Sequence, residues 1–158
     1  MRVLGLDYGS KTIGVAVSDP LRIAALGLEV IRRPEEAALK KSLSRLRDIV
    51  KEYGVATIVL GYPKNLNNTE SERCVKTAAF KDRLRANFKS ADILLWDERL
   101  TSVYAEKTLK SAGLDIPGVK HAIDKTAAVL ILQSYLDYQR TCDGSSNGDI
   151  NERDKRRI

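Results

Sequence analysis

The sequence predicts an α/β domain in which helices cover a mixed β-sheet. Three short strand-like runs come first, and segments with a helical apolar repeat then alternate with further short apolar runs. The chain has 158 residues, the length of one domain, and 43% of them are apolar, which is enough to form a substantial core. We therefore expect one domain over residues 1–140 and a polar tail after it.

The first three elements are expected to be strands. Val3–Asp7 and Thr12–Ser18 flank the turn residues Tyr8-Gly9-Ser10-Lys11, so together they predict a hairpin. Ala24–Ile31 is expected to form the third strand, although its Ala, Leu and Glu residues also suit a helix. A meander of three strands followed by alternating helices and strands indicates a mixed sheet.

The rest of the domain alternates helices with short buried strands. Apolar side chains recur at steps of four and three over Glu35–Tyr53, which predicts a helix that Gly54 ends. The remaining expected elements are strands at Thr57–Gly61 and Asp92–Asp97 and helices at Glu70–Phe88, Thr101–Ala112 and Ile123–Tyr138. Residues 141–158 are rich in turn formers and end in Lys155-Arg156-Arg157 and Ile158, which predicts a flexible tail.

Composition limits the chemistry and the location. The net charge of +6 favours polyanionic partners. The longest aliphatic run, Ala127–Leu132, is far shorter than the ~20 residues that span a bilayer, so we expect no membrane segment. Cys74 and Cys142 form no metal-type pair, which indicates reduced thiols and the cytoplasm. With one histidine, His121, a two-histidine zinc site is excluded, and hydrolysis would rest on carboxylates.

Three acidic positions fall where such a sheet could bring them together. Asp7 ends the first strand, Asp97 and Glu98 end the fifth, and Asp124 begins the last helix. Because side chains alternate across a strand, at most one of Asp97 and Glu98 is expected to join the site. Converging carboxylates need a cation to neutralise them, and oxygen ligands suit Mg²⁺ or Mn²⁺. Two such ions support phosphodiester cleavage without histidine or cysteine.

Each acid also has a purely structural interpretation. Asp7 could be a turn residue, Asp124 could cap its helix, and Glu98 could form a surface ion pair with Arg99. Considered singly, Asp7 and Asp124 favour the structural interpretation, so the metal site depends on convergence in the fold.

Four segments share a specific pattern with a known family. They read Gly-Leu-Asp-Tyr-Gly-Ser-Lys-Thr-Ile-Gly-Val-Ala-Val-Ser-Asp from residue 5, Gly-Tyr-Pro-Lys-Asn from 61, Asp-Glu-Arg-Leu-Thr from 97 and Ile-Asp-Lys-Thr-Ala-Ala-Val-Leu-Ile-Leu-Gln from 123. In this order they resemble the YqgF family of Holliday junction resolvase-like proteins, also described as candidate pre-16S rRNA nucleases. The resemblance covers residues 1 to about 139 and implies an RNase H-like fold with five strands, the first three antiparallel.

The resemblance also implies a site. It assigns catalysis and metal ligation to Asp7, Glu98 and Asp124, with Asp7 bridging two ions, and Asp97 is kept only as a candidate supporting group. Substrate contacts are predicted for Lys11, Asn65, Arg99 and Lys125.

The chain departs from the family pattern at three places. Asn67-Asn68-Thr69 replaces the usual glycine after the loop asparagine, and Ala127 stands where authentic junction resolvases have a second helix acid. The segment before Asp124, Ile116–His121, is shorter and less basic than in relatives. We therefore do not infer junction cleavage from the sequence.

The leading hypothesis is a metal-dependent nuclease that processes the 5′ end of precursor 16S rRNA, acting as a monomer or weak homodimer. The alternatives are a nuclease for branched DNA and a non-catalytic RNA-binding factor for ribosome assembly. A nucleotide-binding module of the actin and sugar-kinase type is also considered, because Asp7-Tyr8-Gly9 resembles its phosphate loop.

Overall fold

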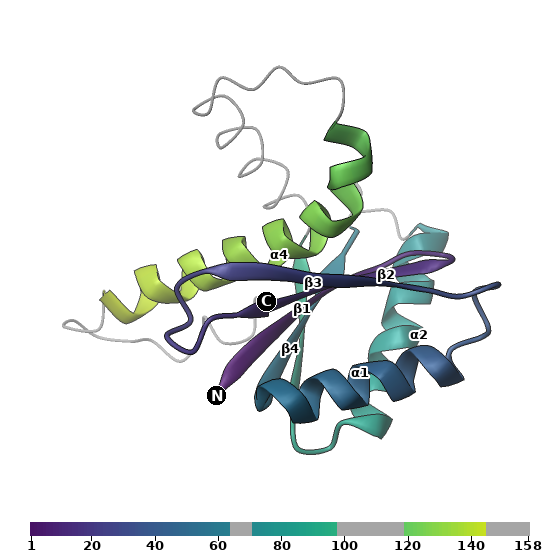
Figure 1. Ribbon diagram of the computed structural model, residues 1–158, viewed down its shortest axis with the longest axis horizontal. Coiled ribbons are helices and arrows are strands. Elements are labelled where there is room, and N and C mark those ends of the chain that lie inside the picture. The colour runs from purple at the N-terminus through teal and green to yellow at the C-terminus, as the bar shows by residue number, and fades with distance from the viewer. Residues whose placement is uncertain (64–70, 98–118, 145–158) are drawn as a thin grey trace.

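The computed structural model describes residues 1–63, 71–97 and 119–144, with side chains of residues 119–126 left out. Within these ranges a five-stranded sheet has the order β3-β2-β1-β4-β5 (Figure 1). The strands are β1 (Arg2–Tyr8), β2 (Thr12–Ser18), β3 (Ala25–Arg32), β4 (Val55–Tyr62) and β5 (Asp92–Asp97). The helices are α1 (Lys40–Tyr53), α2 (Glu72–Asn87) and α4 (Val119–Gly144).

The pairing of the strands confirms the predicted mixed sheet. β1 pairs with β2 and β2 with β3 in antiparallel fashion, whereas β1 with β4 and β4 with β5 are parallel. The Gly9 N–H donates to the Thr12 carbonyl at 2.7 Å and closes the β1–β2 turn. The carboxyl ends of β1, β4 and β5 therefore meet at one edge of the sheet, which we call the carboxyl edge.

Helices cover both faces of the sheet. α1 and α2 lie on one face and α4 on the other (Figure 1). Successive side chains of β1 point to opposite faces, so Leu4, Leu6 and Tyr8 enter the core beneath α1 and α2. Val3 instead packs in the second core, beneath α4. By the same alternation, Asp7 lies on the α4 face.

Gly5 allows α4 to lie directly on the central strand. A Cβ atom at Gly5 would be 2.6 Å from Leu132 Cβ and 3.0 Å from the Ala128 carbonyl oxygen. No side chain fits between the strand and the helix at this point, because non-bonded carbon atoms need ~3.5–4.0 Å. The position of α4 over β1 is thus fixed by backbone contact.

The helix boundaries differ from the predicted ones. α1 begins at Lys40 rather than Glu35, because the preceding segment forms turns, with the Ala38 N–H donating to the Glu35 carbonyl at 3.2 Å. α4 continues to Gly144, so the first four residues of the segment predicted as tail are helical. The remaining tail, 145–158, and the predicted helix over 101–112 lie outside the described residues.

Candidate active site at the carboxyl edge of the sheet

Asp7 is placed at the carboxyl edge by the central strand of the sheet. It is the second-last residue of β1, pairs with Gly14 of β2 and is partly exposed. The other neighbour of β1 is β4, and the two strands are in register through the pair Leu6–Leu60. Leu60 is in turn opposite Leu95 of β5. Ligands of open α/β sheets bind at this kind of edge, beyond the ends of parallel strands.

The alternation along β5 separates Asp97 from Asp7. Ile93 packs in the core beneath α1 and α2, whereas Trp96 packs in the core beneath α4. Asp97 therefore follows on the face of α1 and α2, opposite the face of Asp7. The next position in the alternation is 98, but Glu98 itself lies outside the described residues.

The course of α4 brings its amino-terminal half toward Asp7. Gln133, near the middle of the helix, accepts a hydrogen bond from the Ala25 N–H at 2.9 Å and donates to the Ile23 carbonyl at 2.9 Å. These contacts lie where β3 begins, far from the carboxyl edge. Proceeding back along α4, Ala128 contacts Gly5 of β1, and position 124 is one helical turn further.

The structure describes the other predicted site residues unevenly. Lys11 is exposed in the β1–β2 turn, beside the strand end that holds Asp7. Asp124 and Lys125 lie in α4 where the structure describes the backbone alone, and Asn65 and Arg99 lie outside the described ranges. Among the side chains that are described, no three acids, cysteines or histidines gather into a metal-binding group.

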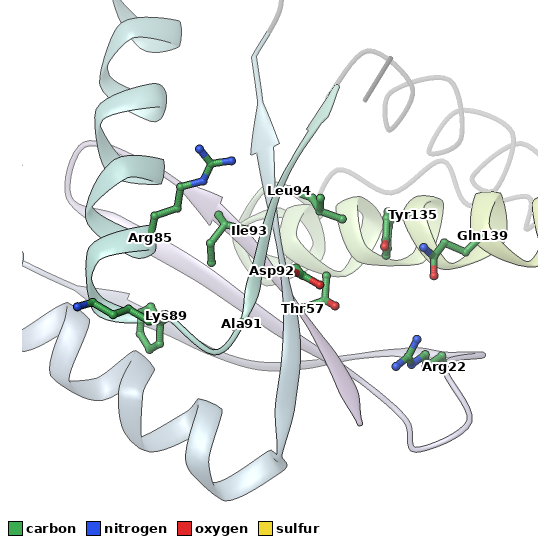
Figure 2. Close-up of a pocket in the computed structure, with 11 residues that line it drawn as sticks. Arg22, Thr57, Arg85, Lys89, Ala91, Asp92, Ile93, Leu94, Tyr135 and Gln139 are labelled. Carbon is green, nitrogen blue, oxygen red and sulfur yellow. The ribbon is translucent and has the colours of Figure 1, made fainter. Parts of the chain in front are cut away.

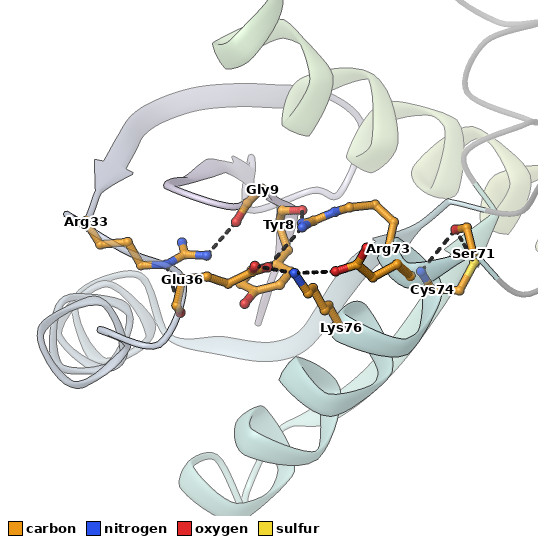
Figure 3. Close-up of polar contacts among 9 residues, drawn as sticks. Tyr8, Gly9, Arg33, Glu36, Ser71, Arg73, Cys74 and Lys76 are labelled. Atoms are coloured by element: carbon orange, nitrogen blue, oxygen red, sulfur yellow. Dashed lines mark hydrogen bonds and ion pairs between the residues drawn. The ribbon is translucent and has the colours of Figure 1, made fainter.

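A cluster of charged residues under the carboxyl edge was not predicted from the sequence. Arg73 donates through Nη2 to the Tyr8 carbonyl at 2.6 Å and through Nη1 to Glu36 at 3.0 Å (Figure 3). The other oxygen of Glu36 accepts from Lys76 Nζ at 2.8 Å. Arg33 donates to the Gly9 carbonyl. We call Arg33, Glu36, Arg73 and Lys76 the arginine–glutamate cluster.

The cluster changes the acidity of its members. The hydrogen bond from Lys76 lowers the pKa of Glu36, Arg73 lowers it further, and partial burial opposes both. The pKa of Lys76 is raised in turn, by Glu36 first and by Glu72 second. Both pKa shifts favour the ionised forms of Glu36 and Lys76, so this pair is charged at neutral pH.

A cavity of about 540 Å³ lies away from this edge (Figure 2). Its lining includes Asp92 and Ile93 at the start of β5 and Tyr135 of α4, so it opens at the amino end of that strand. The side chains of Arg85 and Lys89 point away from Asp92 rather than converging on it (Figure 2). Asp7 and the arginine–glutamate cluster lie at the carboxyl edge, so that edge, and not the cavity, is the candidate site.

None of the helices in residues 1–63, 71–97 and 119–144 is long and apolar enough to cross a membrane.

Comparison with known proteins identifies the family. A family model described as RuvX, Holliday junction resolvase, matches residues 1–138. The chain belongs to this family. The match confirms the resemblance predicted from the four motifs, and with it the prediction that the chain is an enzyme of the nuclease class.

Relatives in the RuvX family cover nearly the whole chain. A protein of Agathobacter rectalis named "Putative pre-16S rRNA nuclease" is 51% identical over 138 residues, which are 87% of this chain and 96% of the relative. A protein of the same name from Geobacillus kaustophilus is 49% identical over 140 residues, covering 89% of this chain and 100% of the relative.

Solved structures confirm the predicted RNase H-like fold. RuvC of T. thermophilus in complex with a Holliday junction superimposes with a TM-score of 0.62 at 17% identity, covering 90% of this chain and 96% of RuvC. The fowlpox virus Holliday junction resolvase gives a TM-score of 0.50 at 14% identity, covering 90% of this chain and 99% of the viral protein.

Proposed function

We propose that this chain is a metal-dependent nuclease whose metal ligands are Asp7, Glu98 and Asp124. The observation that supports this most directly is the contact of α4 with Gly5, two residues before Asp7 on the same face of β1. Positions 124, 128 and 132 share one side of a helix, and Ala128 and Leu132 are the residues that meet Gly5. Alternation along β5 favours position 98 over Asp97 for the same face.

The donor set fits hard divalent cations. Carboxylate oxygens are ligands for Mg²⁺ and Mn²⁺, and a cation removes the repulsion between the acids. When bound, two such ions would activate the attacking water and stabilise the leaving oxygen of the phosphodiester. The central β1 strand would hold Asp7 in place as a ligand, and α4 would bring Asp124.

The proposed substrate is the 5′ end of precursor 16S rRNA, processed in the cytoplasm. The names of the relatives support this choice, and the net charge of +6 suits a polyanion. Lys11 is exposed beside the end of β1 and would contact a phosphate of the RNA. Asn65, Arg99 and Lys125 are proposed as further contacts with the RNA.

Branched DNA is the second candidate substrate, because the matching family is described as a Holliday junction resolvase. A resolvase must pair two active sites to cut two strands, whereas a processing nuclease need not, so for an RNA substrate we propose a monomer or a weak homodimer. Ala127 favours RNA here, since junction resolvases have an acid at that position.

The test is cleavage of end-labelled RNA that contains the 16S leader, beside a four-way DNA junction, in Mg²⁺, Mn²⁺ or EDTA. We expect the RNA to be cut only with metal and Asp7→Asn to abolish the cut. Asp92→Asn is the matched control, because Asp92 begins β5 at the opposite edge of the sheet. Cleavage that survives in Asp7→Asn contradicts the proposed site, and metal-dependent cutting of the junction alone contradicts the proposed substrate.

A further inference from the structure

The two peptide carbonyls that follow Asp7 are each held by an arginine from a distant element. Arg73, in the first turn of α2, donates to the Tyr8 carbonyl at 2.6 Å. Arg33, directly after β3, donates to the Gly9 carbonyl, and its backbone N–H donates to the Lys11 carbonyl at 2.9 Å. Both sides of the β1–β2 turn are therefore tied to the arginine–glutamate cluster (Figure 3).

The hydrogen bond from Arg73 to the Tyr8 carbonyl lies where β1 is no longer paired with β4. The register between β1 and β4 ends with the pair Leu6–Leu60, one residue before Asp7. The end of β1 beyond that pair is bonded to β2 through the pairs of Asp7 with Gly14 and Tyr8 with Ile13. A charge-assisted hydrogen bond from Arg73 therefore adds a second restraint where the ladder with β4 has ended.

The Tyr8 ring fixes both guanidinium groups. The Arg33 guanidinium carbon lies 4.8 Å and that of Arg73 5.2 Å from the ring centroid. The ring itself stacks on Phe80 of α2, with centroids 4.2 Å apart and planes 8° from parallel. Glu36 completes the arrangement by holding Arg73 and Lys76. The cation–π contact with Tyr8, the single ion pair with Glu36 and the hydrogen bond to the Tyr8 carbonyl leave Arg73 little freedom to move.

This arrangement costs stability. Arg33 is only 6% exposed, and in the described structure its Nη1 atom has no hydrogen-bond partner. Burying an unsatisfied polar group is unfavourable, so an apolar residue would suit the core better. Local features that cost stability are characteristic of functional sites.

We propose that Arg73, supported by Arg33, is a positioning residue for Asp7, an inference that rests on the proposed role of Asp7 as a metal ligand. The Tyr8 ring that contacts both arginines lies in the core beneath α1 and α2, whereas Asp7 lies on the α4 face. Arg73 thus acts through the backbone: it fixes the Tyr8 carbonyl and with it the direction of the Asp7 carboxylate. Groups that orient metal ligands typically change metal affinity or activity ~10–100-fold when removed.

The test compares Arg73→Met, Arg73→Lys and Lys76→Met. Lys76→Met is the matched control, because it removes a cation from the same Glu36 on the same helix without touching β1. Mn²⁺ binding to the free protein is measured by electron paramagnetic resonance. The values of kcat and KM are measured with the RNA substrate, and thermal unfolding shows whether each variant is folded. The lysine variant keeps the charge but cannot bridge Glu36 and Tyr8 as the forked guanidinium does.

We expect Arg73→Met to weaken Mn²⁺ binding and lower kcat ~10-fold or more, with KM nearly unchanged. Arg73→Lys should fall between Arg73→Met and the wild type, and Lys76→Met should match the wild type. A raised KM with unchanged kcat and Mn²⁺ affinity would overturn the proposal, since Arg73 would then contact RNA. If Arg73→Met does not fold, Arg73→Lys decides by the same criteria.

Asp7→Asn in the same Mn²⁺ titration separates this inference from the proposed function. If Asp7→Asn binds Mn²⁺ as the wild type does, Asp7 is not a ligand and the proposed site itself fails. If Asp7→Asn loses Mn²⁺ while Arg73→Met retains it with normal kcat, only the positioning role fails.

Discussion

The substitution Gly5→Ala should lower the cleavage rate strongly and the free energy of unfolding only modestly, because Gly5 sets the distance between the central strand and α4. The new Cβ would lie 2.6 Å from Leu132 Cβ, about 1 Å closer than van der Waals contact allows. The new Cβ cannot shift toward Ala128 either, because the Ala128 carbonyl oxygen would be only 3.0 Å away. The helix must therefore move away from β1 by about 1 Å.

The two effects of that displacement have different sizes. Overpacking a core costs ~1–3 kcal/mol. For a chain of this length the cost corresponds to a melting temperature lower by ~2–12 °C. A misplacement of ~1 Å can lower a rate ~100-fold. Because α4 holds Asp124, we expect nuclease activity at 25 °C to fall about that much while the protein remains folded.

The assay is thermal unfolding beside single-turnover cleavage, with Gly27→Ala as the control. A Cβ at Gly27 would lie 3.4 Å from Val129 Cγ2, an ordinary contact with the same helix. Gly27→Ala should therefore keep its activity. If Gly5→Ala retains both its melting temperature and its activity, contact between α4 and β1 does not position the site, and the reasoning is refuted.

Two further predictions concern stability. Ser71→Ala should lower the free energy of unfolding by ~0.5–2 kcal/mol, measured by urea denaturation, because the Ser71 hydroxyl caps α2 by accepting from the Cys74 N–H at 3.3 Å. An unchanged urea midpoint would contradict this role. Glu36→Gln should lower the melting temperature at neutral pH but not in acid. The folded-state pKa of Glu36 lies below the unfolded value, so its contribution is present above the unfolded pKa and is lost as pH falls through the folded pKa. A difference between wild type and variant that persists unchanged at low pH would refute this.

The sequence predicted the sheet well because strand patterns depend on local composition. The limits of β2 were predicted at Thr12 and Ser18 and those of β5 at Asp92 and Asp97, as the structure has them. The start of α1 was wrong by five residues, because the amphipathic pattern extends into Glu35–Leu39. There the side chain of Glu36 pairs with Arg73 and Lys76 of α2, and a turn replaces the helix.

The candidate site was only partly accessible to sequence reasoning. Motif resemblance proposed Asp7, Glu98 and Asp124 as ligands and Lys11 as a substrate contact, and strand alternation allowed at most one of Asp97 and Glu98 in the site. The arginine–glutamate cluster was missed, because Arg73 and Glu36 are 37 residues apart and look like ordinary surface charges in a sequence. A pairing of that length is determined by the packing of α2 against the sheet, which no local pattern encodes.

The two faces of the sheet thus make different contacts with the carboxyl end of β1. On the α4 face, Gly5 removes the side chain that would separate β1 from the helix of Asp124. On the other face, Tyr8 presents a large ring that orders two arginines beneath the β1–β2 turn. Residue 5 must therefore be small and residue 8 aromatic, and the proposed site needs an acid at residue 7, for reasons that come from different neighbours. Moving the register of β1 by one residue would exchange the faces and remove all three functions at once.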